Sequence, residues 1–529
     1  MFSYNPRIGI LMKKLEAGTI YDRSGLILAT SNPELVKKQM QQLREAGAVD
    51  YKLDSVMHKR VTRYYPFEEQ MFFWTGDANT GVFSGGINGY FAEYEHAAEL
   101  RGFKMPVTSY TMIASRYKED RFLPGGPKEM TVLKKDYTAL TSLLISGLDS
   151  TEIKIFKKRN REVRLSVDAD LQTHLQAGLA NDQKLSKNRV SVVVMSSKTG
   201  DVLASAAFPL PPVKNWEQLT MSLSDQNKLD SWTTTADPGF AIATQPGSTA
   251  KLLTAMAGFN KLGLAAAKQT YLVKANERIR TRGPEPDETG QIDMEQAIVK
   301  SNNVYFIKLA NQQHLQEQMG DLYLKTGMFL HGVGGYYYGR KSVNEEQEQR
   351  WLDLWRKTEF SSAYNPNNIY RNRATGISGM AWGQGELIST PAAIARLGSA
   401  IANGGVLVPN RYVLKLADST IKEKEGVLLA RDPAAAALLK QYMIEQSARK
   451  AGVFGIAVAG KTGTPERIIK KKKVNDGWYV FFAPDGSRTG YTVVCIRIEA
   501  TRGSSEAVRV AGETVIPLLV RKGYMKSIN

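Results

Sequence analysis

The positions of the strand-like segments constrain the fold most strongly, because they occur at both ends of one long region. Near its start, a β-branched run turns at Lys198-Thr-Gly-Asp201 into a second apolar run, which predicts a hairpin over residues 189–207. Three more strand-like runs lie near the C-terminus, at residues 454–460, 477–483 and 491–498. Helical patterns fill the interval, at residues 248–262, 293–312, 391–402 and 433–450. This order predicts an α+β domain whose sheet is assembled from distant parts of the chain.

Residues 1–160 indicate a separate N-terminal module, in which short apolar runs are mixed with many charges. Within it we predict strands and loops over residues 51–65 and 76–89, and a short helix over residues 93–100. From residue 161 the pattern becomes more regular. We therefore predict two domains, residues 1–160 and residues 161–529, as a chain of 529 residues allows.

Few residues are available for metal, disulfide or cofactor chemistry. Cys495 is the single cysteine, so no intrachain disulfide and no multi-thiolate zinc site can form. It lies in an apolar strand-like run, which is typical of a buried, unreactive thiol. The five histidines show no metal-ligand spacing. We therefore expect neither a metal nor a cofactor.

The net charge of +18 is spread along the chain rather than gathered in one block. That spread argues against a nucleic-acid-binding arm, and a diffuse basic surface suits an anionic membrane or an acidic polymer equally well. Lys470–Lys473 is either a solvated hairpin loop or a contact for an anionic glycan or membrane. No apolar run is long enough to cross a bilayer and the N-terminus is no signal peptide, so we expect any membrane anchor to lie outside this sequence.

Three short patterns offer the hydroxyl, amide and amine groups that acyl-transfer chemistry uses. S-x-x-K occurs four times, S-x-N five times and K-T-G three times, so each pattern alone carries little weight. Local context separates the copies of S-x-x-K. Ser115 and Ser419 stand in polar stretches, and Ser447 stands near the end of a helical pattern.

Ser248 has the most favourable context among these serines. It follows the breaker Pro246-Gly247 and precedes an apolar helical run, so it lies close to the positive end of a helix dipole. Lys251, three residues later, faces the same side of that helix. The alternative is a simple N-cap serine.

The other two patterns are selected in the same way. Ser301-Asn-Asn303 interrupts two apolar helical runs, where the alternative is an ordinary helix junction. Lys461-Thr-Gly-Thr464 follows a strand of small residues, and its glycine permits close approach of a ligand to the backbone. The alternative there is a strand end with a solvated lysine.

In this order and with these flanks, the motifs resemble those of the penicillin-binding proteins. The likeness extends to Trp382-Gly-Gln-Gly385 and to Asp476-Gly-Trp-Tyr-Val480. Gly18-Thr-Ile-Tyr-Asp-Arg-Ser-Gly25, Arg63-Tyr-Tyr-Pro66 and the segment from Glu93 to Gly102 resemble class B, the monofunctional transpeptidases. The resemblance implies an antiparallel sheet with helices on both sides, together with a β-rich N-terminal pedestal.

The resemblance also implies catalytic roles for five residues: Ser248, Lys251, Ser301, Asn303 and Lys461, the last as the cation beside Lys251. The activity would be that of a serine-type D-Ala-D-Ala transpeptidase, which cross-links peptidoglycan stem peptides and is acylated by β-lactams. Ser248 would be the nucleophile and Lys251 its base. Ser301 would relay a proton to the departing amine, and Asn303 would bond the substrate amide and Lys251.

The same resemblance implies that Lys461-Thr-Gly-Thr464 binds the substrate. Lys461, Thr462 and Thr464 would hold the terminal carboxylate by charge and hydroxyl bonds. The backbone N–H groups of Ser248 and Thr464, which flank the close approach at Gly463, would form the oxyanion hole.

The implied location is the extracytoplasmic, periplasmic face of a bacterial cell membrane. The resemblance leaves open a contact between residues 1–160 and a glycan polymerase of the SEDS type, and implies no nucleic-acid partner. Three rival functions also stay open: a serine β-lactamase, a β-lactam sensor of the same fold, and a non-catalytic cell-wall scaffold. The sequence does not distinguish elongation, division or sporulation.

Overall fold

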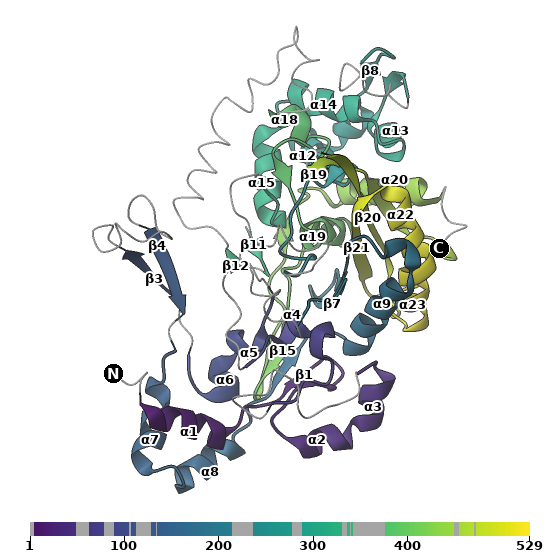
Figure 1. The fold of residues 1–529 in the computed structure, drawn as a ribbon. Coiled ribbons are helices and arrows are strands. Elements are labelled where there is room, and N and C mark those ends of the chain that lie inside the picture. Colours follow the sequence, from purple (N-terminus) through teal and green to yellow (C-terminus); the bar gives the residue numbers. More distant parts are fainter. Residues whose placement is uncertain are drawn as a thin grey trace. The chain divides into compact units, whose positions relative to one another are not determined.

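A computed structural model gives the fold of the chain (Figure 1). It describes residues 5–48, 63–78, 89–104, 107–112, 128–133, 135–213, 236–277, 288–330, 336–338, 340–341, 376–448, 454–469 and 472–528. Unit 1 comprises Met1–Phe83, Tyr90–Leu165 and Val413–Ile421, and unit 2 comprises Ser84–Gly89, Ser166–Tyr412 and Lys422–Asn529. Within the described residues, none of the helices combines the length and apolarity that a bilayer crossing requires.

The sheet of unit 1 differs from the predicted N-terminal domain because it includes a late segment of the chain. Its strand order is β16-β15-β5-β1-β2. The strands are β1 Ile20–Tyr21, β2 Ile27–Ala29, β5 Val163–Leu165, β15 Val413–Leu416 and β16 Ser419–Thr420. β5 pairs in parallel with β1 and antiparallel with β15. Unit 1 thus runs past the predicted boundary at residue 160 and takes up residues 413–421, a pairing that no local pattern reveals.

Three helices of unit 1 share a hydrophobic core: α1 Pro6–Leu15, α7 Thr141–Ser146 and α8 Thr151–Lys158. α1 begins at the N-cap Asn5 and buries Ile8, Leu11 and Leu15, which recur at helical spacing. The other elements are α2 Pro33–Lys38, α3 Met40–Glu45, α4 Phe72–Thr75, α5 Ala92–Glu95, α6 Ala97–Arg101, β3 Val107–Met112 and β4 Lys128–Leu133. The predicted short helix over residues 93–100 is therefore present as α5 and α6. Most of residues 51–65 and 76–89 lies outside the described residues.

Two charged side chains of unit 1, Arg63 and Glu93, form a buried ion pair. Arg63 Nε lies 2.7 Å from Glu93 Oε1, and neither side chain is accessible to solvent. Arg63 also donates to the carbonyl of Gly18 at 2.6 Å, and Arg101 donates to the carbonyl of Glu93. These residues come from the three segments whose motifs suggested a pedestal, so the pair joins segments that are distant in the sequence.

Unit 2 contains the predicted sheet built from both ends of its region. The order is β18-β20-β21-β6-β7, with β19 also paired to β20, and all pairings are antiparallel. The strands are β6 Val190–Ser196, β7 Val202–Phe208, β18 Ala459–Gly463, β19 Glu466–Ile469, β20 Lys472–Pro484 and β21 Tyr491–Thr501. The expected strand at 454–460 was placed too early, since pairing begins only at Ala459.

Helices cover both faces of this sheet (Figure 1). α9 Ala169–Asn181, α22 Ser504–Val510 and α23 Ile516–Arg521 lie over one face, where Leu175, Val192 and Ile496 belong to a single core. α19 Pro391–Ala402 covers the other face, where a Cβ on Gly398 would lie within 3.1 Å of Val480 and Val493. Cys495 is buried in β21, and burial raises the pKa of its thiol, as expected for an unreactive cysteine.

The remaining helices agree with the predicted ranges, and α15 Gln316–Thr326 and α18 Gly376–Met380 lie outside those ranges. The others include α12 Lys251–Leu262, α13 Met294–Val299, α14 Asn303–Gln312 and α20 Pro433–Ala448. The helical pattern over residues 293–312 divides into α13 and α14 at the predicted interruption, because Ser301 has a φ of 58° and Asn302 caps α14. Short strand pairs complete the unit: β8 Tyr271–Val273 with β9 Gly290–Ile292, β10 Phe329–Leu330 with β13 Leu387–Ile388, β11 Tyr336–Tyr337 with β12 Arg340–Lys341, and β14 Val406–Leu407 with β17 Val427–Leu428.

Candidate active site

Ser248 lies in the 3-10 turn η7 Gly247–Ala250, which runs directly into α12. The serine makes no capping hydrogen bond, so the alternative of a simple N-cap serine is wrong. Its hydroxyl has no hydrogen-bond partner among the described residues. Lys251, three residues later, is the first residue of α12 and is fully buried. The turn η7 and helix α12 thus carry the Ser248 hydroxyl, which makes no described hydrogen bond, and the solvent-inaccessible Lys251 amine three residues apart.

Three glycines bring the backbone around Ser248 into close contact. The N–H of Gly247 donates to the carbonyl of Gly383 at 2.9 Å. A Cβ on Gly383 would lie 1.8 Å from the oxygen of Gly247, and a Cβ on Gly463 would lie 2.8 Å from the oxygen of Pro246. Any side chain at these positions would push the turn away from its neighbours. Glycine in K-T-G is therefore needed here because the turn that carries Ser248 packs on β18.

The hydroxyl of Ser301 lies between two buried amines. Lys251 Nζ donates to Ser301 Oγ at 3.1 Å and also to the Ser301 carbonyl. Lys461 Nζ donates to the same Oγ at 3.0 Å and to the Thr462 carbonyl at 3.2 Å. Two buried amines thus lie within hydrogen-bonding distance of one hydroxyl. Lys461 is inaccessible to solvent, so the alternative of a solvated strand-end lysine is wrong.

Asn302 and Asn303 have different tasks in the segment after Ser301. Asn302 Oδ1 accepts the N–H of Tyr305 at 3.0 Å, and its amide donates to the carbonyl of Glu288 at 3.1 Å. Asn303 Oδ1 is buried and has no hydrogen-bond partner. No hydrogen bond joins Asn303 to Lys251 among the described residues, since the Lys251 amine is directed at Ser301. Asn302 thus holds the helix, and Asn303 keeps an acceptor available for another molecule.

The end of β18 and the residue that follows it place Thr462, Gly463 and Thr464 beside this turn. Lys461 pairs with Val480 in the sheet, which fixes the register of the whole motif. Thr464 is exposed, and its hydroxyl accepts the N–H of Ser504 at 3.0 Å, which leaves its own hydrogen free to donate. A Cβ on Gly247 would lie 3.2 Å from the Thr464 nitrogen, so the peptide groups of Ser248 and Thr464 are close neighbours.

A buried charge network that the sequence analysis missed holds the chain segment that leads to Ser248. Arg467 binds Asp476 at 2.9 Å and Glu499 at 2.8 Å, and Arg497 donates to the carbonyl of Ile242 at 2.7 Å. Burial alone would raise the pKa of Glu499, but the nearby Arg497 and two other guanidinium groups hold it well below its ordinary value. Arg497 and Glu499 share one face of an apolar strand, and this spacing is the signal that could have identified them.

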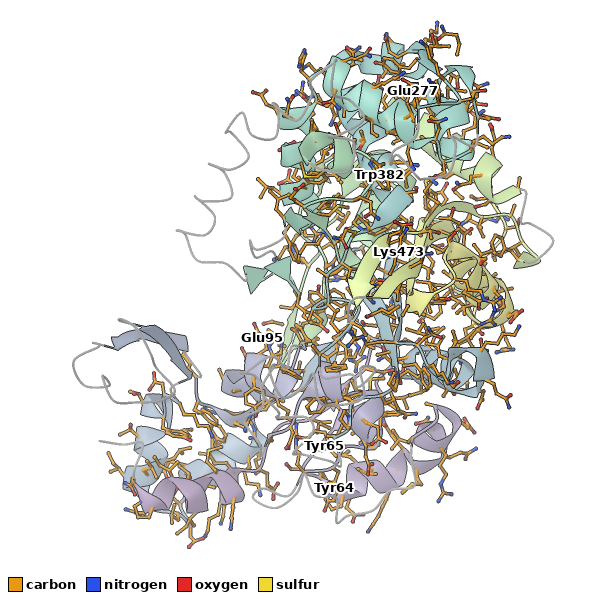
Figure 2. All side chains as sticks on the ribbon, turned by 45° about the horizontal axis from the view of Figure 1, so that its top comes forward. Tyr64, Tyr65, Glu95, Glu277, Trp382 and Lys473 are labelled. Atoms are coloured by element: carbon orange, nitrogen blue, oxygen red, sulfur yellow. The ribbon has the colours of Figure 1, made fainter. Side chains whose placement is uncertain are left out.

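Lys470–Lys473 is described only in part. Lys470 and Lys471 lie outside the described residues. Lys473, labelled in Figure 2, is exposed on β20 and lies 2.6 Å from Glu466 of β19. An exposed pair of this kind contributes little to stability.

Comparisons with known proteins agree with this geometry. The family described as "Penicillin binding protein transpeptidase domain" matches residues 190–516. The chain is 22% identical over 504 residues to Stage V sporulation protein D of Bacillus subtilis, covering 92% of this chain and 67% of the relative. It is 23% identical to penicillin-binding protein 3 of Bacillus subtilis, covering 61% of this chain and 46% of that relative.

A solved structure shares the fold. Penicillin-binding protein A from Mycobacterium tuberculosis, in a penicillin G acyl-enzyme complex, superposes with a TM-score of 0.59 at 18% identity. The alignment covers 96% of this chain and 99% of that chain. At this identity the likeness supports the fold of both the transpeptidase region and the N-terminal region.

Proposed function

The chain belongs to the penicillin-binding protein transpeptidase family, and from that membership we propose that it cross-links peptidoglycan stem peptides through an acyl-enzyme on Ser248. One observation carries the proposal: the Ser301 hydroxyl accepts hydrogen bonds from both Lys251 and Lys461. Serine acyl transfer needs a base for the attacking hydroxyl and a proton donor for the leaving amine. A hydroxyl between two amines, next to an open serine, can supply both.

Acylation begins with Lys251 in its neutral form, which the repulsion from Lys461 favours. The Ser248 hydroxyl gives its proton to Lys251 Nζ as its oxygen attacks the carbonyl carbon of the penultimate D-Ala. Negative charge then develops on the carbonyl oxygen. The adjoining N–H groups of Ser248 and Thr464 are the donors that would stabilise it.

Collapse of this intermediate breaks the peptide bond to the terminal D-Ala. Ser301 donates its proton to the departing nitrogen and receives one from the Lys251 ammonium, so the proton taken from Ser248 reaches the leaving group. Lys461 stays positively charged and, with Thr462 and Thr464, binds the terminal carboxylate. Asn303 Oδ1 accepts the amide N–H of the bound peptide. An amine of a second stem peptide then attacks the ester, and the same protons move in reverse.

β-Lactams would acylate Ser248 as substrate mimics. The test is intact-protein mass against time after addition of benzylpenicillin. We expect one adduct with the whole mass of the drug, lasting many minutes, and none in Ser248→Ala. Ser419→Ala is the matched control, because Ser419 also stands in an S-x-x-K pattern and lies in unit 1; this variant is expected to keep the adduct.

The rival functions give different outcomes in this experiment. An adduct that forms and vanishes within seconds while the drug is consumed would favour a β-lactamase. Absence of any adduct on the folded protein would favour a scaffold. An adduct on Ser248 without cross-linking of stem peptides would favour a β-lactam sensor.

We propose further that the protein works at the extracytoplasmic face of the cell membrane, in cell-shape, division or spore wall synthesis. The similarity to Stage V sporulation protein D supports a cell-wall role. Residues 1–160 would contact a SEDS-type glycan polymerase. Co-purification with that polymerase, lost when exposed side chains within residues 1–160 are replaced without loss of the fold, tests the contact; unchanged co-purification would contradict it.

A further inference from the structure

A second cavity lies in unit 2, apart from the catalytic residues. Its volume is about 230 Å³, and none of Ser248, Lys251, Ser301 or Lys461 lines it. The wall comes from the end of α15, the first turns of α19 and the chain before and after residues 413–421. The side chains that give it chemical character are Phe240, Tyr338, Arg396, Asn410, Tyr412 and Lys424.

Arg396 places a positive charge in this wall. One guanidinium N–H donates to the carbonyl of Lys325 at 2.8 Å. The Nε is inaccessible to solvent and has no hydrogen-bond partner among the described residues. No ion pair involves Arg396 within the part of the chain that the structure describes, and burial lowers the pKa of its guanidinium. A role as cap of α15 accounts for a single N–H of a group that carries five.

Three aromatic residues form another part of the wall. The rings of Phe240 and Tyr338 are stacked with their centroids 4.2 Å apart, and Tyr412 lies 5.4 Å from Tyr338. The Tyr338 hydroxyl donates to the buried Asp237, which fixes the ring against the core. This wall suits a flat apolar group.

Asn410 adds an acceptor to the wall of the cavity. Its amide donates to the Tyr412 hydroxyl at 3.2 Å, and its Oδ1 is buried without a hydrogen-bond partner in the part of the chain that the structure describes. An unsatisfied buried acceptor is unfavourable unless another molecule supplies a donor. Lys424 is exposed at the rim and adds a second positive charge.

We propose that this cavity binds a small organic carboxylate with an N–H group and an apolar body, of the class of N-acylated amino acids. The carboxylate pairs with Arg396, and the N–H meets Asn410 Oδ1. The apolar group lies against Phe240 and Tyr338. The cavity is therefore a second ligand site of the transpeptidase unit, built from a different set of residues than the catalytic centre.

The test uses hippurate (N-benzoylglycine) as the probe and isothermal titration on the whole chain. We expect a dissociation constant of about 1 mM, as the size of the probe allows. Hippuramide, which has the same ring and N–H but no charge, is expected not to bind at that concentration. Absence of hippurate binding up to about 20 mM, or equal binding of both compounds, overturns the proposal.

Variants locate the binding. Arg396→Met is expected to weaken hippurate binding at least about tenfold, while Arg396→Lys retains part of it. Unchanged affinity in Arg396→Met overturns the proposal, including the case in which hippurate occupies the catalytic site. Lys424→Gln is expected to weaken binding about twofold to fivefold, as removal of a rim charge does. Lys422→Gln is its matched control, because Lys422 is an exposed neighbour outside the wall.

Lys424→Gln keeps the proposal testable if Arg396→Met does not fold. Lys424 is exposed, so its replacement is expected to leave the fold intact, and the hippurate affinity of this variant then tests the proposal. Equal hippurate affinity in Lys424→Gln and Lys422→Gln, together with loss of the Arg396→Met protein, overturns the proposal.

Discussion

Both units bury charged side chains, but they arrange them in opposite ways. In unit 1, Arg63 is matched by the carboxylate of Glu93. In unit 2, Lys251 and Lys461 approach the same hydroxyl of Ser301. An ion pair of opposite signs holds distant segments together, whereas two amines of like charge that share one hydroxyl oppose each other. Buried charge therefore serves the fold in the first unit and chemistry in the second.

The largest expected effect follows from removing the base. Lys251→Met is expected to slow acylation by benzylpenicillin at least about 10³-fold, because the Ser248 hydroxyl loses its proton acceptor. Lys251→Arg is the sharper variant, since it keeps the charge but cannot lose a proton. Both rates are measured by intact-protein mass. Substantial acylation of Lys251→Arg would show that charge, rather than proton transfer, is what the site needs.

Removing one partner of the matched pair is expected to damage the fold instead. Arg63→Met removes the guanidinium nearest the buried Glu93 carboxylate and leaves Arg101 at 3.8 Å, so it is expected to cost about 3 kcal/mol in urea unfolding. Lys37→Met is the control, because the Lys37–Glu34 pair is 69% and 67% exposed and its loss is expected to leave the free energy of unfolding unchanged within measurement error. Equal decreases in the free energy of unfolding for Arg63→Met and Lys37→Met would contradict the expectation that the buried pair stabilises the fold more than the surface pair.

A buried carboxyl group in unit 2 gives a pH-dependent prediction. Burial raises the pKa of Asp237 to about 6, despite hydrogen bonds from Tyr338 and Ser205 that lower it. The folded state therefore keeps a proton that the unfolded state releases near pH 4, and this stabilisation is lost as the pH rises through about 6. Asp237→Asn stays neutral, so its stability relative to wild type is expected to rise by about 1–3 kcal/mol between pH 4 and 7.5.

Melting temperatures of both proteins at several pH values measure this difference. Parallel curves for wild type and Asp237→Asn would mean that Asp237 titrates normally. The comparison uses the slope with pH rather than the absolute stability, because Asn reproduces only part of the hydrogen bonding around the carboxylate.

The smallest effect is expected at the exposed pair Lys473–Glu466. Lys473→Gln is expected to change the free energy of unfolding by less than about 0.5 kcal/mol and to leave acylation unchanged. Replacing Lys470–Lys473 with Gln tests the remaining alternative for this run. Weaker binding to vesicles containing anionic lipid would support a surface contact, and unchanged binding would contradict it.

Much of the site could be predicted because context, rather than motif alone, separated the copies. The breaker before Ser248, the interruption at Ser301 and the small-residue strand before Lys461 are local features, and local features are visible in a sequence. The hydroxyl shared by the two lysines was not predictable. It depends on the positive φ of Ser301 and on a backbone approach of three glycines from separate segments.

Long-range pairing limited the prediction of the fold in the same way. β15 resembles any short apolar run, and nothing near it indicates that β5 is its partner. Likewise the sequence around Arg396 predicts only a helix residue. Tertiary packing brings its guanidinium to the carbonyl of Lys325 and into a cavity that aromatic residues also line.

The late entry of β15 and β16 into the sheet of unit 1 sets an order for biosynthesis. A growing chain makes β1, β2 and β5 early, but β5 keeps one open edge until residues 413–416 have left the ribosome. Unit 1 is thus started first and finished only when most of unit 2 exists. A chain halted in between presents a bare strand edge that can pair with a neighbouring copy. Unit 1 therefore cannot complete its sheet from the N-terminal residues alone. Its folding includes closure of the long chain segment between β5 and β15.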